Sequence, residues 1–156
     1  MIVLLALNVT IVIAQAPEES RACQGFKARA NNALSLGSYA DAVEYFLQAE
    51  AQCQYFEKDN YNRLLLCLQN VLGSYEQGNE TFEKYNQILL RVYDTMDQKG
   101  IYNEIDDIFR GYYETLANIP NYKKADKYLS RGIKNRGKDL SDAYFIILFY
   151  FNTYTM

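Results

Sequence analysis

Histidine is absent from the 156 residues, and this absence excludes several kinds of catalytic site. Neither a Ser-His-Asp triad nor a Cys-His pair can be assembled without an imidazole. A zinc site would lack its usual nitrogen ligand, and the three cysteines show no Cys-x-x-Cys spacing. No glycine-rich phosphate loop is present. The sequence therefore predicts no enzyme, no metal site and no cofactor.

Paired acids are also scarce. The pairs Glu18-Glu19 and Asp106-Asp107 are adjacent in the chain, and neighbouring residues of a helix point in different directions, so neither pair predicts an acid/base dyad. A net charge of −3 argues against general nucleic-acid binding. A helical glycan-active enzyme remains only as the less favoured alternative.

The composition is that of an ordinary globular chain. Hydrophobic residues make up 49% of it and charged residues 22%, and the length suits one domain. Fifteen tyrosines and eight phenylalanines are many for this length. Where these rings recur at helical spacing, we interpret them as core and groove lining.

The N-terminus carries a short apolar run at residues 2–13, followed by Ala14-Gln15-Ala16. This pattern predicts a signal peptide over residues 1–16 and a mature chain of 17–156, in the periplasm or secreted. No Lys or Arg precedes the run, which is atypical of such signals. A membrane anchor and a buried terminal helix are the alternatives. The run is too short to span a bilayer, which takes about 20 residues.

Residues 23–53 predict a helical hairpin. Gly37 ends a first helix, and Tyr39, Ala42, Phe46 and Ala49 then recur at steps of three, four and three, which places them on one face of a second helix. The small alanines let two backbones approach, and the rings fill the space beside them. A matching face on the first helix comes from Phe26, Ala30, Ala33 and Leu34.

Two cysteines lie at similar heights in this hairpin. Cys23 is fourteen residues before Gly37 and Cys53 is sixteen after it. We predict that they approach closely. An extracytoplasmic location permits a disulfide between them, and two small buried hydrophobic side chains are the alternative. Cys67 would be the remaining thiol, buried in a helix.

The hairpin resembles a tetratricopeptide repeat (TPR). That pattern has a small residue in the first helix, Gly-x-Tyr at the turn, and then alanine, an aromatic residue and alanine along the second helix. The matching residues are Ala30, Gly37, Tyr39, Ala42, Phe46 and Ala49. The resemblance implies a scaffold that binds other proteins or peptides, without naming the partner.

Two further repeats follow the first. We expect repeats at about 18–58, 59–99 and 101–136, with Gly73 and Phe82 defining the second and Tyr122, Ala125, Leu129 and Gly132 the third. Tyr85 stands where a small residue is expected and should push the helices of the second repeat apart or tilt them. The turn aromatics Tyr39, Phe82 and Tyr122 are 43 and 40 residues apart, against the usual family period of about 34. The resemblance therefore implies extended repeats, as in some bacterial regulators.

In such a repeat the first helices line a concave groove. The resemblance implies that Lys27, Asn31, Asn70, Ser74, Arg110 and Glu114 face this groove and are candidates for peptide binding. Lys27 and Asn31 match two places of the clamp that holds a peptide carboxylate in some family members, and the other places do not match. A solvated helix face is the alternative for each of the six.

A basic cluster lies between residues 121 and 138, with seven positive charges against one negative charge. Lys123, Lys127 and Arg131 are four residues apart and form one stripe of a helix. We interpret this stripe as a solvated face. An acidic partner or an anionic polymer is the alternative.

The C-terminal residues 139–156 predict a partial fourth repeat: a helix without its partner, so that the chain looks cut short. Its segment 143–151 is apolar almost all round. Self-association through this segment, or the start of a membrane helix, are the alternatives. No complete membrane span is predicted.

Together these features predict an all-α solenoid of antiparallel hairpins, a right-handed superhelix of about three repeats plus one unpaired helix. The leading function is an exported scaffold that binds a protein or peptide. It could form the sensory or regulatory region of a longer bacterial signalling protein. A structural homo-oligomer is the alternative.

Overall fold

The computed structural model describes residues 19–136, except the side chains of Glu104, Ile133, Asn135 and Arg136. The predicted signal peptide at 1–16 and the predicted partial repeat at 139–156 lie outside this range. Within it the chain is all-helical, with six α-helices and no strand, and none of these helices is both long and apolar enough to cross a membrane. The helices are α1 (Arg21–Ser35), α2 (Tyr39–Gln52), α3 (Lys58–Leu72), α4 (Glu80–Gln98), α5 (Glu104–Leu116) and α6 (Tyr122–Arg136).

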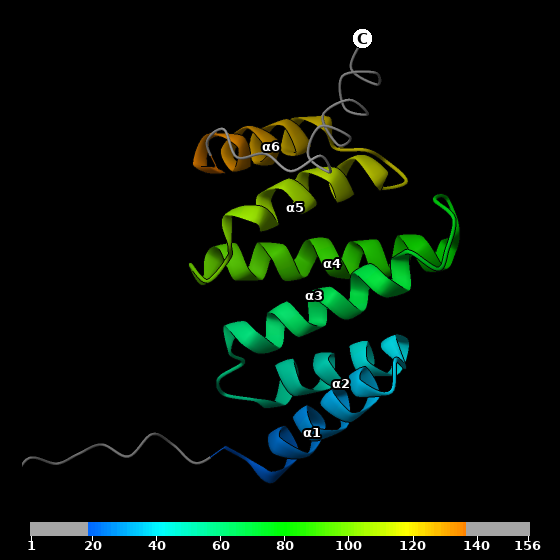
Figure 1. Cartoon of the computed structure of the whole chain (residues 1–156), viewed down its shortest axis with the longest axis vertical. Coiled ribbons are helices and arrows are strands. Elements are labelled where there is room, and N and C mark those ends of the chain that lie inside the picture. Colours follow the sequence, from blue (N-terminus) through cyan, green and yellow to red (C-terminus); the bar gives the residue numbers. More distant parts are fainter. Residues whose placement is uncertain (1–18, 137–156) are drawn as a thin grey trace, which may run out of the picture.

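The helices stack in chain order (Figure 1), and each packs on the next. Turns at Gly37 and Gly78 join α1 to α2 and α3 to α4, and Gly100 follows α4; all three glycines have positive φ (73°, 86° and 65°). That left-handed backbone is one that other residues rarely adopt. The chain can therefore reverse direction within a few residues and lay each helix against the one before it.

The seam between α1 and α2 is built from small side chains, as the alanine spacing predicts. Ala30, Ala42 and Ala49 have no exposed surface, and Phe46 fills the space beside them, also fully buried. Three alanine side chains at this spacing let the two helix backbones approach closely, and the larger Phe46 ring packs beside them. The first hairpin is thus held by apolar packing along its length.

The middle of the stack holds the main core. Leu64, Leu68, Leu89, Val92 and Met96 are fully buried between α3 and α4. The cluster to which they belong runs continuously from α1 through α4. Tyr85 is buried as well, and α3 and α4 approach each other over less of their length than α1 and α2 do.

The seam between α5 and α6 is built from glycine. A Cβ on Gly111 would lie 2.6 Å from Leu129 Cγ and 3.0 Å from the carbonyl oxygen of Ala125, and one on Gly132 would lie 2.8 Å from a side-chain carbon of Ile108. These distances are shorter than van der Waals contact, so only glycine fits both positions. Ala125 and Leu129, predicted as packing residues, are buried here.

Two expected packing residues have other roles. Tyr122 is 40% exposed, because it is the first residue of α6 and the seam begins one turn later at Ala125. Gly73 is exposed, and a Cβ there would meet only carbonyl oxygens of its own helix. It caps α3, which ends at Leu72, and beyond it Ser74 N and Tyr75 N donate to the Val71 and Leu72 carbonyls and tighten the turn that follows.

Candidate functional site

Four of the six predicted groove residues lie on or beside α1 and α3 with part of their surface exposed. Lys27 forms an ion pair with Glu19. Asn31 accepts a hydrogen bond of 2.8 Å from Arg63 Nη1, which ties α1 to α3. Asn70 donates to the Leu66 carbonyl, and Ser74 Oγ donates to the Asn70 carbonyl at 3.2 Å. These side chains keep polar atoms at the surface.

Arg110 and Glu114 lie elsewhere than predicted. Both are buried, at 3% and 4% exposed, so they cannot line an open groove. The Arg110 guanidinium pairs with Asp94 and Asp97 of α4 and lies 3.6 Å from the centre of the Tyr128 ring. Burial lowers the pKa of Arg110, and the neighbouring Tyr128 and Glu114 oppose this shift.

Arg131 extends the same set of ion pairs. Its Nε donates to Asp107 Oδ2 at 2.7 Å, and its Nη2 lies 3.3 Å from Asp97 Oδ1. The hydrogen bond to Asp107 raises the pKa of Arg131 further. The predicted basic stripe therefore divides: Lys123 and Lys127 are exposed, whereas Arg131 is partly buried and pairs with the buried carboxylate of Asp107.

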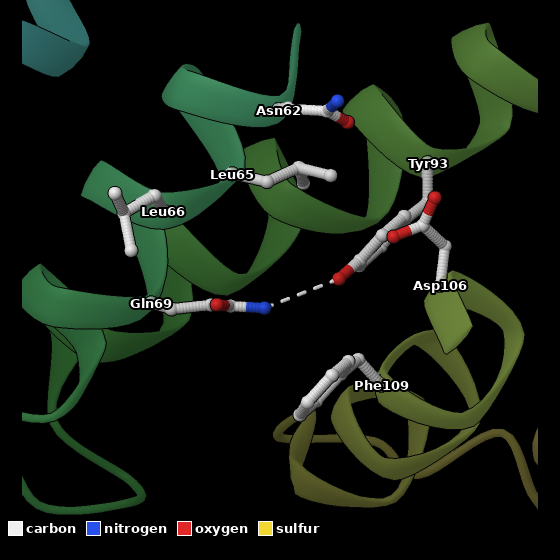
Figure 2. Close-up of a pocket in the computed structure, with 7 residues that line it drawn as sticks. All are labelled: Asn62, Leu65, Leu66, Gln69, Tyr93, Asp106 and Phe109. Carbon is white, nitrogen blue, oxygen red and sulfur yellow. Dashed lines mark hydrogen bonds between the residues drawn. The ribbon is translucent and has the colours of Figure 1, made fainter. Parts of the chain in front are cut away.

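A pocket of about 240 Å³ opens where α3, α4 and α5 meet. Figure 2 shows side chains of α3 facing those of α4 and α5 across it, with the hydrogen bond from Gln69 Nε2 to Tyr93 Oη, 3.3 Å long, joining the two sides. The walls are mainly apolar with a few polar groups. The lining residues are Asn62, Leu65, Leu66, Gln69, Tyr93, Asp106 and Phe109.

Asp106 gives this pocket its charge. It is the third residue of α5, and its Oδ2 accepts from Asn103 N at 2.6 Å in a capping box. The side chain is only 8% exposed, and burial raises the pKa of its carboxyl. Among the described side chains, no Lys or Arg nitrogen lies within the 4.0 Å of an ion pair with Asp106.

Tyr93 is a neutral polar residue of the pocket, as Asn62 and Gln69 are. Its side chain is 1% exposed, and burial together with the nearby charge of Asp106 raises the pKa of its phenol. The hydroxyl therefore stays protonated at neutral pH. Because Gln69 donates to the phenol oxygen, the hydroxyl hydrogen can be offered to another acceptor.

The comparisons with known proteins identify no relative. No protein-family model, no curated protein and no solved structure matches the chain. The function of the candidate site therefore has to be inferred from the geometry and chemistry of the residues that line it.

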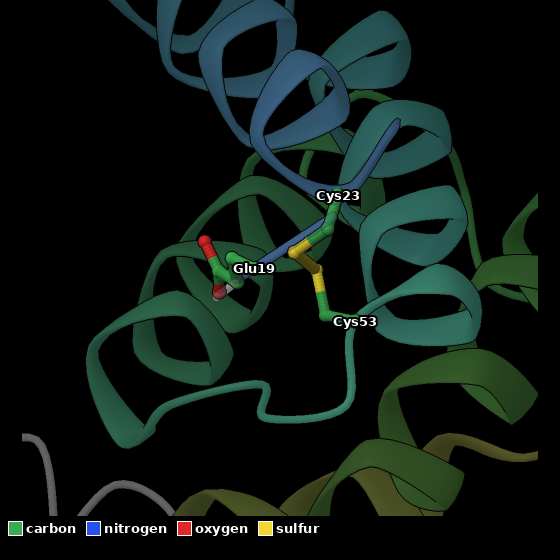
Figure 3. Close-up of side chains that lie close together, drawn as sticks. All are labelled: Glu19, Cys23 and Cys53. Carbon is green, nitrogen blue, oxygen red and sulfur yellow. A yellow bond between two sulfur atoms is a disulfide. The ribbon is translucent and has the colours of Figure 1, made fainter. Parts of the chain in front are cut away.

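The two paired cysteines and Glu19 form another cluster of chemically active side chains. Cys23 and Cys53 are joined by a disulfide with Cα atoms 5.0 Å apart, and the Glu19 carboxylate lies beside it (Figure 3). One ligand atom from each of the three residues lies within 4.8 Å of the others. Because each sulfur is bonded to the other, neither offers a thiolate to a metal ion. The disulfide fastens the start of α1 to the residue that follows α2.

Sequence reasoning overlooked this pocket. It considered Asp106 only as a member of an acid pair with Asp107, it placed Tyr93 on the apolar face of its helix, and it assigned no role to Asn62 or Gln69. One signal was available: Asn103 and Asp106 have the spacing of a capping box, which fixes Asp106 at the start of a helix. That α3 supplies the opposite wall depends on how the second hairpin meets the third, and no local pattern encodes this.

Proposed function

We propose that this protein is an exported TPR-like scaffold that binds an extended segment of another protein or a peptide along the surface formed by α1, α3 and α5. The stack would then be a right-handed solenoid, and these three are its first helices. The single observation that supports the binding role most is the pocket between α3 and α5, which is lined by four residues of α3 and two of α5.

Other features of the same surface agree with the proposal. Leu66 lines the pocket and is 48% exposed, Asn70 bonds to its carbonyl, and Asn31 and Arg63 join α1 to α3 by a hydrogen bond. A few placed polar groups among apolar ones are typical of recognition sites. The pocket alone is below the roughly 300 Å³ at which small-molecule sites begin. It therefore suits one side chain of a longer ligand better than a whole small molecule.

Selection of random peptides on the full-length protein tests this function. We expect peptides whose binding shifts the backbone NMR signals of α3 and α5 and is weakened by Leu66→Ala. Tyr55→Ala is the matched control, because Tyr55 is 59% exposed but lies in the loop between α2 and α3. Peptides that lose affinity equally with both variants, or a selection that yields none, would contradict the proposal.

Export has a separate test. The disulfide between Cys23 and Cys53 supports an oxidising compartment. N-terminal sequencing of protein recovered from the envelope or medium should begin at residue 17. A chain that starts at Met1 and remains reduced in the cytoplasm would contradict export. Self-association through 143–151 also stays a prediction, which light scattering on the full chain can test.

A further inference from the structure

We propose that the pocket between α3, α4 and α5 is a subsite for an alkylammonium group, namely the side chain of a lysine in the bound peptide. This inference rests on the proposed function and names the chemistry of its ligand. The pocket joins a carboxylate that has no basic partner among the described side chains to an apolar channel lined by Leu65, Leu66 and Phe109.

Charge complementarity selects a cation. A carboxylate that is 8% exposed loses most of its hydration, and Asn103 compensates this only in part, through its backbone N–H and its side chain. A basic group from the ligand would supply what the described residues do not. Anionic ligands are excluded by the same charge, because like charges at this distance repel strongly where water is scarce.

The shape and the remaining polar groups favour an ammonium. Its three N–H donors need acceptors; among the lining residues the Asp106 carboxylate and the Gln69 side-chain carbonyl can accept, while the Tyr93 oxygen already accepts from Gln69. Leu65, Leu66 and Phe109 can cover the methylene chain that carries it, and an aromatic face also attracts a cation. A volume of about 240 Å³ holds such a chain.

One basic residue of this chain could compete for the site. Lys58, at the first position of α3, lowers the pKa of Asp106 through its charge although it lies outside ion-pair distance. Its side chain is exposed, so it can move. Removing the positive charge of Lys58 should leave the Asp106 carboxylate free to pair with a ligand cation. We therefore expect Lys58→Gln to bind alkylammonium two- to fivefold more tightly, roughly the effect of one screened charge.

NMR titration of the full-length protein with n-butylammonium chloride tests the subsite directly. We expect saturable shifts of the Asp106, Phe109 and Tyr93 signals, and no saturation with n-butanol or butyrate at the same ionic strength. Asp106→Asn should weaken binding by about tenfold or more, as loss of a charged hydrogen bond does. Asp59→Asn, which removes an exposed carboxylate paired with Arg63, is the matched control and should leave it unchanged.

A second variant keeps the test valid if Asp106→Asn does not fold. Gln69→Glu adds a carboxylate on the opposite wall, and the Tyr93 hydroxyl can donate to it. We expect it to bind n-butylammonium several-fold more tightly. Circular dichroism of each variant establishes that the helices are intact. Weaker binding by folded Gln69→Glu, or titration curves that do not depend on Asp106, would overturn the proposal.

The selected peptides separate this inference from the function on which it rests. Peptides that require a lysine, and that lose affinity with Asp106→Asn, support both. Peptides that bind α3 and α5 without any basic residue overturn the lysine subsite and leave the scaffold in place. If n-butylammonium saturates the pocket while no peptide binds, a free amine is the ligand and the scaffold proposal fails.

Discussion

The first and third hairpins solve the same packing problem with different chemistry. Between α1 and α2, Ala30, Ala42 and Ala49 let two helices meet in an apolar seam, and a disulfide closes the open end. Between α5 and α6, glycines make the close approach, and the buried Asp107 of α5 pairs with Arg131 of α6. An apolar seam stabilises the fold because it removes hydrophobic surface from water. A buried ion pair adds little net stability, but losing one partner leaves the other charge buried and unpaired, which is strongly destabilising.

The difference extends to how each hairpin joins the rest. The main core runs from α1 to α4, whereas Ile108, Ala125, Tyr128 and Leu129 of the third hairpin lie outside it. Helices α4 and α5 approach each other over less of their length than any other consecutive pair.

Apolar and polar contacts share that junction, and Phe109, Tyr113 and Leu116 of α5 pack against the main core. Asn86 Nδ2 donates to the Tyr113 carbonyl at 3.1 Å, and Arg110 and Arg131 both pair with Asp97. The buried Asn86 Oδ1 has no hydrogen-bond partner within the described residues. An unsatisfied acceptor and paired charges stabilise less than an apolar interface of the same size. The third hairpin should therefore open more easily than the first two.

The largest expected effect comes from removing the covalent link in the first hairpin. Replacing Cys23 and Cys53 by alanine frees a loop of 30 residues in sequence separation. The chain-entropy account gives a loss of about 3–4 kcal/mol in the free energy of unfolding, which urea denaturation measures. In protein that is unfolded but not reduced, a thiol assay should detect one free cysteine, Cys67. In the folded state, burial raises the pKa of the Cys67 thiol to about 11. Three titratable thiols would contradict the disulfide.

The next effect tests the alanine seam. Ala42→Leu places a large side chain where no surface is exposed and should reduce the free energy of unfolding by about 1–3 kcal/mol. Ala40→Leu on the same helix is the matched control, because Ala40 is exposed, and it should stay within about 0.5 kcal/mol. Equal effects at the two positions would show that the seam is not tightly packed.

Two glycine substitutions with opposite signs test the third hairpin. Gly111→Ala forces a methyl group against Leu129 and the Ala125 backbone, so the overpacking should exceed the gain in helix propensity and cost about 1 kcal/mol net. Gly25→Ala in α1 meets no atom within 4 Å and should stabilise by about 0.5–1 kcal/mol. Thermal unfolding measures both. Stabilisation by Gly111→Ala would refute the close approach of α5 and α6.

The smallest expected effect concerns the pocket. Because burial raises the pKa of Asp106, the folded state binds this proton more tightly than the unfolded chain, and the charged form costs stability at neutral pH. Asp106→Asn should then raise the melting temperature slightly at pH 7. The gain should shrink as the pH falls through the raised pKa and vanish below the ordinary value of 3.8. A gain that grows toward low pH would contradict the burial.

Sequence patterns sufficed for the helices and for most of the seams. The spacing of Ala42, Phe46 and Ala49 predicts one buried face, and all three are fully buried. This works because apolar periodicity reports local burial directly. The resemblance to TPR proteins itself is not tested by the fold, since an all-helical stack is compatible with other families.

The positions of Arg110 and Glu114 could not be predicted in the same way. A charged residue is ordinarily expected at the surface, because burying its charge is unfavourable unless partners from other helices lie beside it. Those partners are Asp94 and Asp97 on α4 and Lys124 on α6. The pair between Glu114 and Lys124 forms across the α5–α6 seam, where α6 packs closely on Gly111, and a single sequence does not distinguish Gly111 from an ordinary helical glycine.

Native-state hydrogen exchange of the full-length protein, followed residue by residue, tests the contrast between the hairpins most directly. The account predicts that amides of α5 and α6 exchange together through an opening of lower free energy than those of α1 to α4. Asn86→Asp, which adds a charge at the polar junction, should lower that free energy further without changing protection in α1 and α2. Uniform protection across all six helices, or faster exchange in α1 and α2 than in α5 and α6, would contradict it.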